Sequence, residues 1–471
     1  MGRGWIGWWR VIRPWASAVC LVAAALAAVW GLERTGGLGG LLAGLVGVGA
    51  AALYAVHPPR MVRRRRAARR PPAPTTWSRR RHTAWTATIA LVAAFAVWNL
   101  TSMVLYVSRH NTADPLQQRM ATWGRDHGYS PIIDWLEART YDEPPSVEPA
   151  DELALDDDLT GRTTTSTTVA EGPTESTVPP TSTIPTPQAP APLATYFTPA
   201  LAGEGQWAEI TRAGGQPAVW ATSIRPYPDA GGVVATMAVI DQTYLRASMF
   251  NGDEEPGGSW VRDDHVPTEL YAPLVVAMNS GFRFEHINGG YMTEGQVLKP
   301  LLAGEATMAI GPDGRMVIGE LGREILDDGS WVSIRQNLKL MVDGGVSTVN
   351  TPATSGVWWG ADFGREVYVN RSAVCELADG RLAYLLVGKV DAAQMAQSLV
   401  NVGCIKAVQL DINGTWPNFF TFVHNADGSL QPVFLDRRMG SNTYRYLRKS
   451  AKEFFAFFDI TLVPPGSVLD V

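Results

Sequence analysis

The sequence predicts an α+β protein in which three transmembrane helices precede a strand-rich outer domain with a few helices. Three observations support this prediction. The first 107 residues hold three long apolar stretches, and the region after residue 193 alternates short apolar runs with Gly, Asp and Pro turns. Charge is also divided unevenly, because 15 of the 40 basic residues but only one of the 45 acidic residues precede His110. The acidic remainder argues against nucleic acid as a partner.

The apolar stretches cover residues 15–30, 36–56 and 84–107, and each is close to the roughly 20 residues that cross a bilayer. The connection at residues 57–82 contains RMVRRRRAARR and WSRRRH. Because Lys and Arg are retained in the cytoplasm, this pattern places the N-terminus and the arginine loop inside, and everything after residue 107 outside. We therefore expect a cell-membrane protein that contacts membrane lipids and carries an extracytoplasmic C-terminal domain.

Composition divides the chain into five parts. Residues 1–108 form the three-span anchor with its Arg-rich cytoplasmic loop, and residues 109–143 are expected to form two short juxtamembrane helices. Residues 144–192 are rich in Thr, Ser and Pro. Such a segment buries too little apolar surface to offset its ordering entropy, so we expect a disordered linker there. Residues 193–464 form the outer domain, and residues 465–471 form a tail.

Local signals predict several elements of the outer domain. Asp379 and Gly380 supply the tight turn of a hairpin. A helix is expected over residues 391–403, because Asp391 is a good N-cap and Gly403 a good helix stop. The apolar run at residues 408–410 predicts a strand that ends at Asp411.

The outer domain contains two cysteines, Cys375 and Cys404. Outside the membrane they could form one disulfide, but each lies in an apolar context, so two buried thiols are an equal alternative. Two cysteines without nearby histidines do not suggest a metal site. The chain also has no Gly-x-Ser-x-Gly elbow, Walker loop or His-Glu-x-x-His pair. We therefore expect neither a metal nor a cofactor.

A series of sequence blocks follows one order in the outer domain. They are MNSGFRF (278–284), NGGYMTEGQVLKP (288–300), MAIGPDGRMVIG (308–319), LKLMVDGG (338–345), VNRSAVCELADGRLAYLLVG (369–388) and VGCIKAVQLDINGT (402–415). In this order they resemble the phosphodiester glycosidase domain family, over most of residues 205–425. The membrane-proximal ATWGRDHG and DWLEARTY resemble segments of its membrane-anchored bacterial members. The family's best known activity removes N-acetylglucosamine from a phosphodiester.

The resemblance implies roles for individual residues. Asp411 would act as base or nucleophile at the anomeric carbon, and Arg371 would stabilise the departing phosphate. Hydrogen-bonding groups and close backbone approach to the substrate would come from Asn279, Gly281, Ser372, Asn413, Gly414 and Thr415. We expect Asp411, Arg371, Asn279 and the Asn413-Gly414 turn to converge on one cleft that binds a carbohydrate or sugar phosphate.

The motif around Asp411 differs from the family's Leu-Asp-Gly-Gly-Gly-Ser, because Ile412 and Asn413 replace two glycines. Side chains there restrict the backbone and narrow any pocket that the turn lines. Two functions are therefore expected as alternatives. The first is a membrane-anchored extracytoplasmic hydrolase that cleaves a sugar from a phosphodiester in envelope polymers or lipid-linked glycans. The second is a non-catalytic envelope protein that keeps the fold to bind a glycan or a partner.

Overall fold

The computed structural model describes residues 76–109, 116–140, 144–160, 186–349, 359, 368–412, 416–439 and 442–470. The chain divides into two compact units, residues 1–89 and 90–471. In the first unit, the described part is the beginning of helix α3 (Thr76–Arg109). The first two expected membrane spans lie outside the described residues.

Among the described residues one helical stretch, Thr88–Arg109, is long and apolar enough to cross a membrane. It coincides with the third expected span, and none of its most apolar window is buried inside the protein. Two short helices, α4 (Leu116–Asp126) and α5 (Ser130–Thr140), follow it as expected. Pro131 falls in the first turn of α5, where its missing N–H leaves no intrahelical bond unmade.

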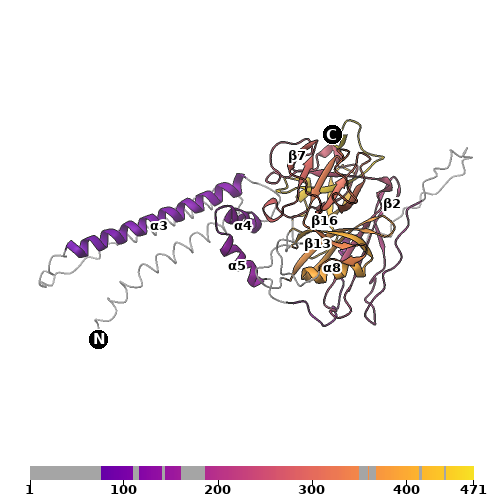
Figure 1. The fold of residues 1–471 in the computed structure, drawn as a ribbon, viewed down its shortest axis with the longest axis horizontal. Coiled ribbons are helices and arrows are strands. Elements are labelled where there is room, and N and C mark those ends of the chain that lie inside the picture. Colours follow the sequence, from indigo (N-terminus) through magenta and orange to yellow (C-terminus); the bar gives the residue numbers. More distant parts are fainter. Residues whose placement is uncertain are drawn as a thin grey trace, which may run out of the picture. The chain divides into compact units, whose positions relative to one another are not determined.

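Three antiparallel sheets build the outer domain (Figure 1). The eight-stranded sheet has the order β1 (Ala208–Ala213), β2 (Gln216–Ile224), β3 (Ala235–Ile240), β14 (Leu382–Val390), β13 (Val369–Leu377), β15 (Cys404–Ile412), β11 (Leu340–Asp343) and β12 (Val346–Ser347). One five-stranded sheet has the order β7 (Gln296–Lys299), β6 (Tyr291–Thr293), β10 (Ser333–Gln336), β8 (Ala306–Ile310) and β9 (Met316–Glu320). The other has the order β17 (Leu430–Phe434), β16 (Phe419–His424), β5 (Leu274–Asn279), β18 (Phe454–Asp459) and β4 (Leu245–Phe250).

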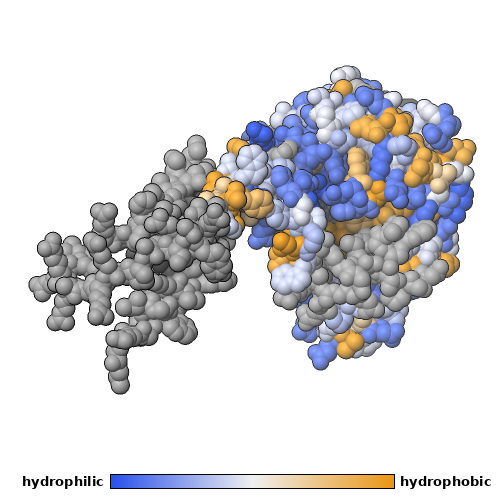
Figure 2. All heavy atoms as spheres, turned by 60° about the vertical axis from the view of Figure 1, so that its left-hand side comes forward, coloured by the Kyte–Doolittle hydropathy of each residue, from blue (hydrophilic) through white to orange (hydrophobic). Residues whose placement is uncertain are grey.

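Short helical elements lie before, between and after these strands. They are α6 (Asp157–Thr160), α8 (Ala392–Asn401) and the 3₁₀ turns η1 (Gln242–Tyr244), η2 (Thr268–Leu270), η3 (Phe284–His286), η4 (Arg445–Leu447) and η5 (Val468–Asp470). The expected α+β class with a strand majority is therefore present in the described part of the chain. Polar and apolar side chains are interspersed over the face of the domain that Figure 2 shows.

The eight-stranded sheet is covered on both faces. Tyr384 of β14 and Leu410 of β15 belong to a core shared with strands of the two smaller sheets. Leu385, the neighbour of Tyr384, points the other way and packs with Met395 of α8, a helix that contacts β14 and β15. Strands buried on both faces are apolar at nearly every position, which explains why these segments lack a polar–apolar alternation.

The hairpin and the helix predicted from local signals are present. Strands β13 and β14 pair across Asp379 and Gly380. Helix α8 begins after Asp391, whose side chain accepts from the Gln394 N–H at 2.7 Å, and Gln394 Oε1 accepts in return from the Asp391 N–H at 3.2 Å. This reciprocal capping box satisfies two N–H groups that a helix start leaves unpaired.

Cys375 and Cys404 form a disulfide with their Cα atoms 5.7 Å apart. The bond joins the neighbouring strands β13 and β15. Of the two alternatives, a disulfide or two buried thiols, the structure therefore has the disulfide.

The expected linker is partly folded at its beginning. Residues 144–160 pack on the outer domain, with Ala154 and Leu159 buried. Leu155 forms a bridge with Asp436, and the Arg437 N–H donates to the Ala154 carbonyl. The apolar residues of DELALDDDLT give this part a surface to bury, which the following Thr-rich residues do not have. Residues 161–185 lie outside the described part.

Candidate active site

A bulge near the end of β15 determines where Asp411 points. Two residue steps on β13, from Arg371 to Ala373, oppose three steps on β15, from Gln409 to Ile412. An extra residue breaks the alternation of side chains between the two faces of a sheet. The Asp411 side chain is therefore free to turn away from the face that Gln409 occupies.

The Asp411 carboxylate is buried and ion-paired. The residue is 5% exposed, and its Oδ2 lies 2.5 Å from Lys452 Nζ. The same ammonium donates to the Gly281 carbonyl at 2.6 Å. Burial raises the pKa of the Asp411 carboxyl, and the Lys452 charge offsets part of that rise. In its ionised form, a carboxylate at the end of a strand can serve as a base or a nucleophile.

Three cations surround the ring of Trp416, which follows Asp411 by five positions. The Arg445 guanidinium carbon is 4.7 Å, Lys452 Nζ 4.8 Å and the Arg283 guanidinium carbon 5.7 Å from the ring centroid. Cations over an aromatic face are attracted by its quadrupole. The ring and its three cations therefore place an aromatic side chain and positive charge beside a carboxylate.

Acidic side chains balance part of this positive charge. Arg283 pairs with Glu254 at 2.8 Å, and a fully buried pair at 2.8 Å joins Arg335 to Glu453, the residue after Lys452. The second Glu453 carboxylate oxygen is buried without a hydrogen-bond partner among the described residues. Buried charges are tolerated when they are paired. The Asp411–Lys452 pair is therefore one of several ion pairs that together make up the site.

Asn279 and Ser372 position the backbone at Asp411. Asn279 Oδ1 accepts from the Tyr384 hydroxyl at 2.9 Å and from the Asn418 N–H at 2.8 Å. Its amide nitrogen donates to Ser372 Oγ at 3.1 Å, and Ser372 Oγ donates to the Asp411 carbonyl at 2.7 Å.

The Asn279 amide also donates to the Ser280 carbonyl at 3.1 Å, so both of its donors and both of its acceptor positions are used. Asn279 and Ser372 were expected to bind substrate. In the structure they instead form a chain of hydrogen bonds that ends on the Asp411 backbone carbonyl and holds that backbone in place.

Gly281 lies directly against the end of β15. A Cβ atom at this position would come within 2.9 Å of Asn337 Cγ, so the close approach requires glycine. Asn337 in turn accepts from the Phe282 N–H at 3.1 Å and donates to the Gln409 carbonyl at 2.5 Å. The Gly281 carbonyl thus accepts a hydrogen bond from Lys452, and the lack of a side chain lets the residue pack closely against Asn337.

The structure does not bring Arg371 to Asp411. Arg371 Nε donates to the Val390 carbonyl at 2.9 Å and its Nη1 to the Trp359 carbonyl at 3.2 Å. These acceptors lie on the α8 face of the sheet, whereas its neighbour Ser372 points to the other face. Burial lowers the pKa of Arg371 to about 10, partly offset by Asp391, so it remains a cation at neutral pH. The expected convergence of Arg371, Asn279 and Asp411 on one cleft is therefore not found.

Asn413, Gly414 and Thr415 lie outside the described residues, and their expected roles stay predictions. Ile412 is described, and it is buried with Phe282 and Leu338 in a small apolar cluster. Its side chain therefore occupies space beside the site that glycine would leave open.

Sequence reasoning missed Lys452, Arg445 and Trp416. Lys452 and Arg445 lie after the last block of the family resemblance, and 41 residues separate Lys452 from Asp411. The available signal was the pair Lys452-Glu453 directly before FFAFF, because charges at the start of a fully apolar strand must find partners. Trp416 stands in the aromatic segment TWPNFF, where nothing in the sequence indicates that three cations contact its ring.

No protein-family model and no curated protein matches the chain. Among solved structures, it is similar to the catalytic domain of zebrafish N-acetylglucosamine-1-phosphodiester alpha-N-acetylglucosaminidase, auto-inhibited by its pro-peptide. The identity is 16% and the TM-score 0.35, over 54% of this chain and 87% of that chain. It is also similar to a hypothetical protein from Synechocystis, with 10% identity and a TM-score of 0.34 over 52% of this chain and 63% of that one. Both similarities are weak and concern the fold alone.

Proposed function

We propose that the chain is a membrane-anchored extracytoplasmic hydrolase that cleaves a sugar from a phosphodiester. One observation carries the proposal: the buried carboxylate of Asp411 lies beside Lys452, which with Arg445 and Arg283 surrounds the ring of Trp416. The order of the sequence blocks that resemble phosphodiester glycosidases supports it.

The chemistry matches these groups. Breaking the bond between an anomeric carbon and a phosphate develops positive charge on the sugar and negative charge on the leaving phosphate. Asp411 would serve the sugar side, as a base for water or as a nucleophile. Lys452 and Arg445 take over the phosphate-stabilising role that the sequence assigned to Arg371. Trp416 offers an apolar ring face for a sugar.

Two features support the proposal that the outer domain lies outside the cytoplasm. Thr88–Arg109 is suited to cross a bilayer, and arginines precede it on the side that the positive-inside rule assigns to the cytoplasm. The Cys375–Cys404 disulfide fits an oxidising compartment.

A second candidate is a binding protein without turnover. It is favoured by Ile412, which fills space beside Asp411, and by the low exposure of the carboxylate itself. In that case the ring and cations of the site would hold a sugar phosphate that is not cleaved.

The test is release of free sugar from a panel of glycosyl phosphodiesters by the full chain in lipid nanodiscs. Asp411→Asn should abolish release, while Asp427→Asn, in an exposed turn where the carboxylate accepts hydrogen bonds from Ser429, should not. Thermal unfolding of each variant shows whether it is folded. Absence of turnover by the folded parent across the panel would contradict the proposal.

Replacing Ile412 with glycine separates the two candidates. A hydrolase whose pocket is narrowed by Ile412 should gain turnover in Ile412→Gly. A dedicated binding protein should retain the same sugar phosphate affinity, measured by calorimetry, with no turnover in either form.

A further inference from the structure

Helix α4 and the turn that leads from it to α5 are joined to the C-terminal end of α3 by side-chain hydrogen bonds. Trp123 Nε1 donates to Ser102 Oγ at 3.2 Å, and His127 Nε2 lies 3.1 Å from the same oxygen. The Tyr129 hydroxyl donates to Asn99 Oδ1 at 2.8 Å. The α4–α5 hairpin therefore rests on the last three turns of the candidate membrane span.

These contacts lie at the depth of a membrane interface. Arg81 is the last charged residue before the apolar stretch and belongs at the inner headgroup level. At a rise of about 1.5 Å per residue, Asn99 lies about 27 Å along α3 from Arg81, which is near the outer edge of a hydrocarbon core about 30 Å thick. Asn99 also donates to the Phe95 carbonyl at 2.8 Å. Polar side chains at this depth need protein partners, and the hairpin supplies one for each.

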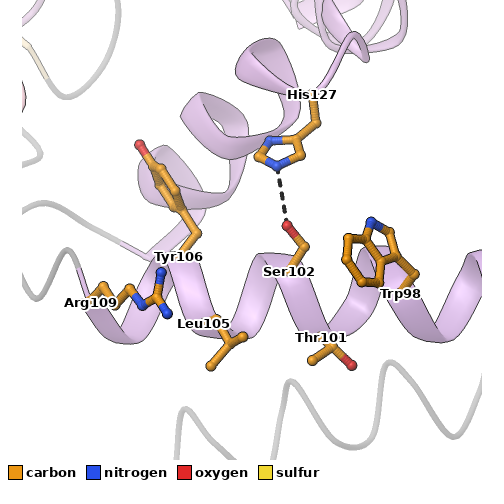
Figure 3. A pocket seen from close by; sticks show the side chains of 7 residues that line it. All are labelled: Trp98, Thr101, Ser102, Leu105, Tyr106, Arg109 and His127. Atoms are coloured by element: carbon orange, nitrogen blue, oxygen red, sulfur yellow. Dashed lines mark hydrogen bonds between the residues drawn. The ribbon is translucent and has the colours of Figure 1, made fainter.

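A cavity of about 300 Å³ opens beside these contacts (Figure 3). Its lining comes from Trp98, Leu105, Tyr106, Arg109 and His127, together with Thr101 and Ser102. Aromatic rings at the edge of an apolar span are typical of the level where lipid headgroups meet acyl chains. The cavity is remote in sequence from Asp411 and shares no residue with the candidate active site.

Helix α5 presents an apolar face. Ile132, Trp135 and Leu136 are 56%, 52% and 54% exposed, and their spacing places them on one side of the helix. Ile133 faces α4 instead, where the absence of a side chain on Gly124 allows close packing. Helix α3 exposes apolar side chains as well, among them Leu91 and Phe95.

We propose that the α4–α5 hairpin lies in the outer membrane–water interface, with Ile132, Trp135 and Leu136 inserted among the lipids. A helix with one apolar face gains free energy by burying it at the headgroup boundary. The inference rests on the membrane anchoring proposed above, because α3 brings the hairpin to that depth.

The hairpin also contacts the candidate active site. Arg283 Nη2, one of the cations around Trp416, donates to Thr122 Oγ1 of α4 at 3.4 Å. An interfacial hairpin thus holds Asp411 close to the bilayer surface. The substrate class that this position favours is a lipid-linked glycosyl phosphate carried in the outer leaflet, rather than a soluble diester.

Site-directed spin labelling of the full chain in phosphatidylcholine nanodiscs tests the docking. The label is attached to Leu136→Cys in a Cys20→Ser background, where the Cys375–Cys404 disulfide does not react. Leu91→Cys on α3 and Asp328→Cys on an exposed turn of the outer domain are the matched controls. We expect the ratio of oxygen to nickel-complex accessibility at Leu136→Cys to be several-fold above that at Asp328→Cys and similar to that at Leu91→Cys.

Other results would separate the possibilities. Aqueous accessibility at Leu136→Cys, with lipid accessibility at Leu91→Cys, overturns the docking and leaves the anchor standing. Aqueous accessibility at both positions overturns the anchor as well. Spin–spin broadening at Leu136→Cys would show that a second copy of the chain covers the face, which also overturns the proposal.

Activity supplies a second readout for the substrate class. The double variant Ile132→Glu/Leu136→Glu should lose several-fold in turnover of a lipid-linked glycosyl phosphate in the nanodisc and keep its turnover of a soluble short-chain analogue. Equal loss on both substrates contradicts the proposed class. Absence of turnover by the parent on both substrates is instead a failure of the proposed hydrolase, and the spin-label result then decides the docking alone.

Discussion

At the scale of single residues, two opposing effects act on Asp411. Burial favours its neutral form, and Lys452 favours its ionised form. Because the net pKa is raised on folding, the carboxyl binds its proton more tightly in the folded chain. Its contribution to the free energy of unfolding is thus largest at low pH and is lost as pH rises from the ordinary value toward the raised one.

Lys452 should therefore determine the pH below which kcat/KM falls, the acid limb of the pH–activity profile. If Asp411 acts as an ionised base or nucleophile, kcat/KM falls as pH drops through its raised pKa. Lys452→Met removes the charge that lowers this pKa, so the limb should move to higher pH by about one unit or more. Lys449→Met is the control, since Lys449 pairs with Asp253. An unmoved limb would show that another group controls it.

The same pair should show coupling in stability. Asp411→Asn leaves the Lys452 ammonium buried without its carboxylate, a loss of about 3–5 kcal/mol for a pair of this kind. Lys452→Met leaves the carboxylate unpaired. The double variant should recover much of this loss, because it removes both buried charges. Thermal unfolding of the four proteins measures the coupling, and additive losses would mean that the two charges do not stabilise each other.

At the scale of elements, what the sequence predicts correctly is local. The turn at Gly380 and the cap at Asp391 are each decided by residues within a few positions, and both are present. The prediction that Arg371 lies beside Asp411 was wrong. An apolar run shows neither the bulge in β15 nor which of the two buried faces of the sheet a side chain occupies. Lys452 was missed because its pairing with Asp411 bridges separate strands and has no local signature.

The cap of α8 gives a prediction at this scale. Asp391→Ala removes the acceptor for the Gln394 N–H and should lower the free energy of unfolding by about 1 kcal/mol. Asp391→Asn keeps a good cap but removes the charge that acts on Arg371, so it separates the two roles. Gln397→Ala, at an exposed position of the same helix, should have little effect. Equal loss in the Ala and Asn variants would assign the stabilisation to the charge instead.

At the scale of the whole molecule, the disulfide bears both on the stability of the fold and on the proposed placement of the outer domain outside the cytoplasm. Cys375 and Cys404 are 29 residues apart, and closing a loop of this length stabilises the folded state by about 3–4 kcal/mol through the unfolded chain. The bond joins β13 to β15, the two strands that carry Ser372 and Asp411. Its formation therefore bears on the candidate site as well as on the sheet.

The disulfide predicts how the chain behaves in cells. If the outer domain lies beyond the membrane, as proposed, alkylation of intact cells before lysis should leave Cys375 and Cys404 unmodified until a reductant is added, as mass spectrometry of the tryptic peptides would show. The double variant Cys375→Ser/Cys404→Ser should unfold at a lower temperature than the parent, whereas Cys20→Ser should not change the outer domain. Complete alkylation of both thiols without reductant would place the domain in the cytoplasm, because thiols are kept reduced there. That result would remove envelope glycans from the substrates that Asp411 could reach.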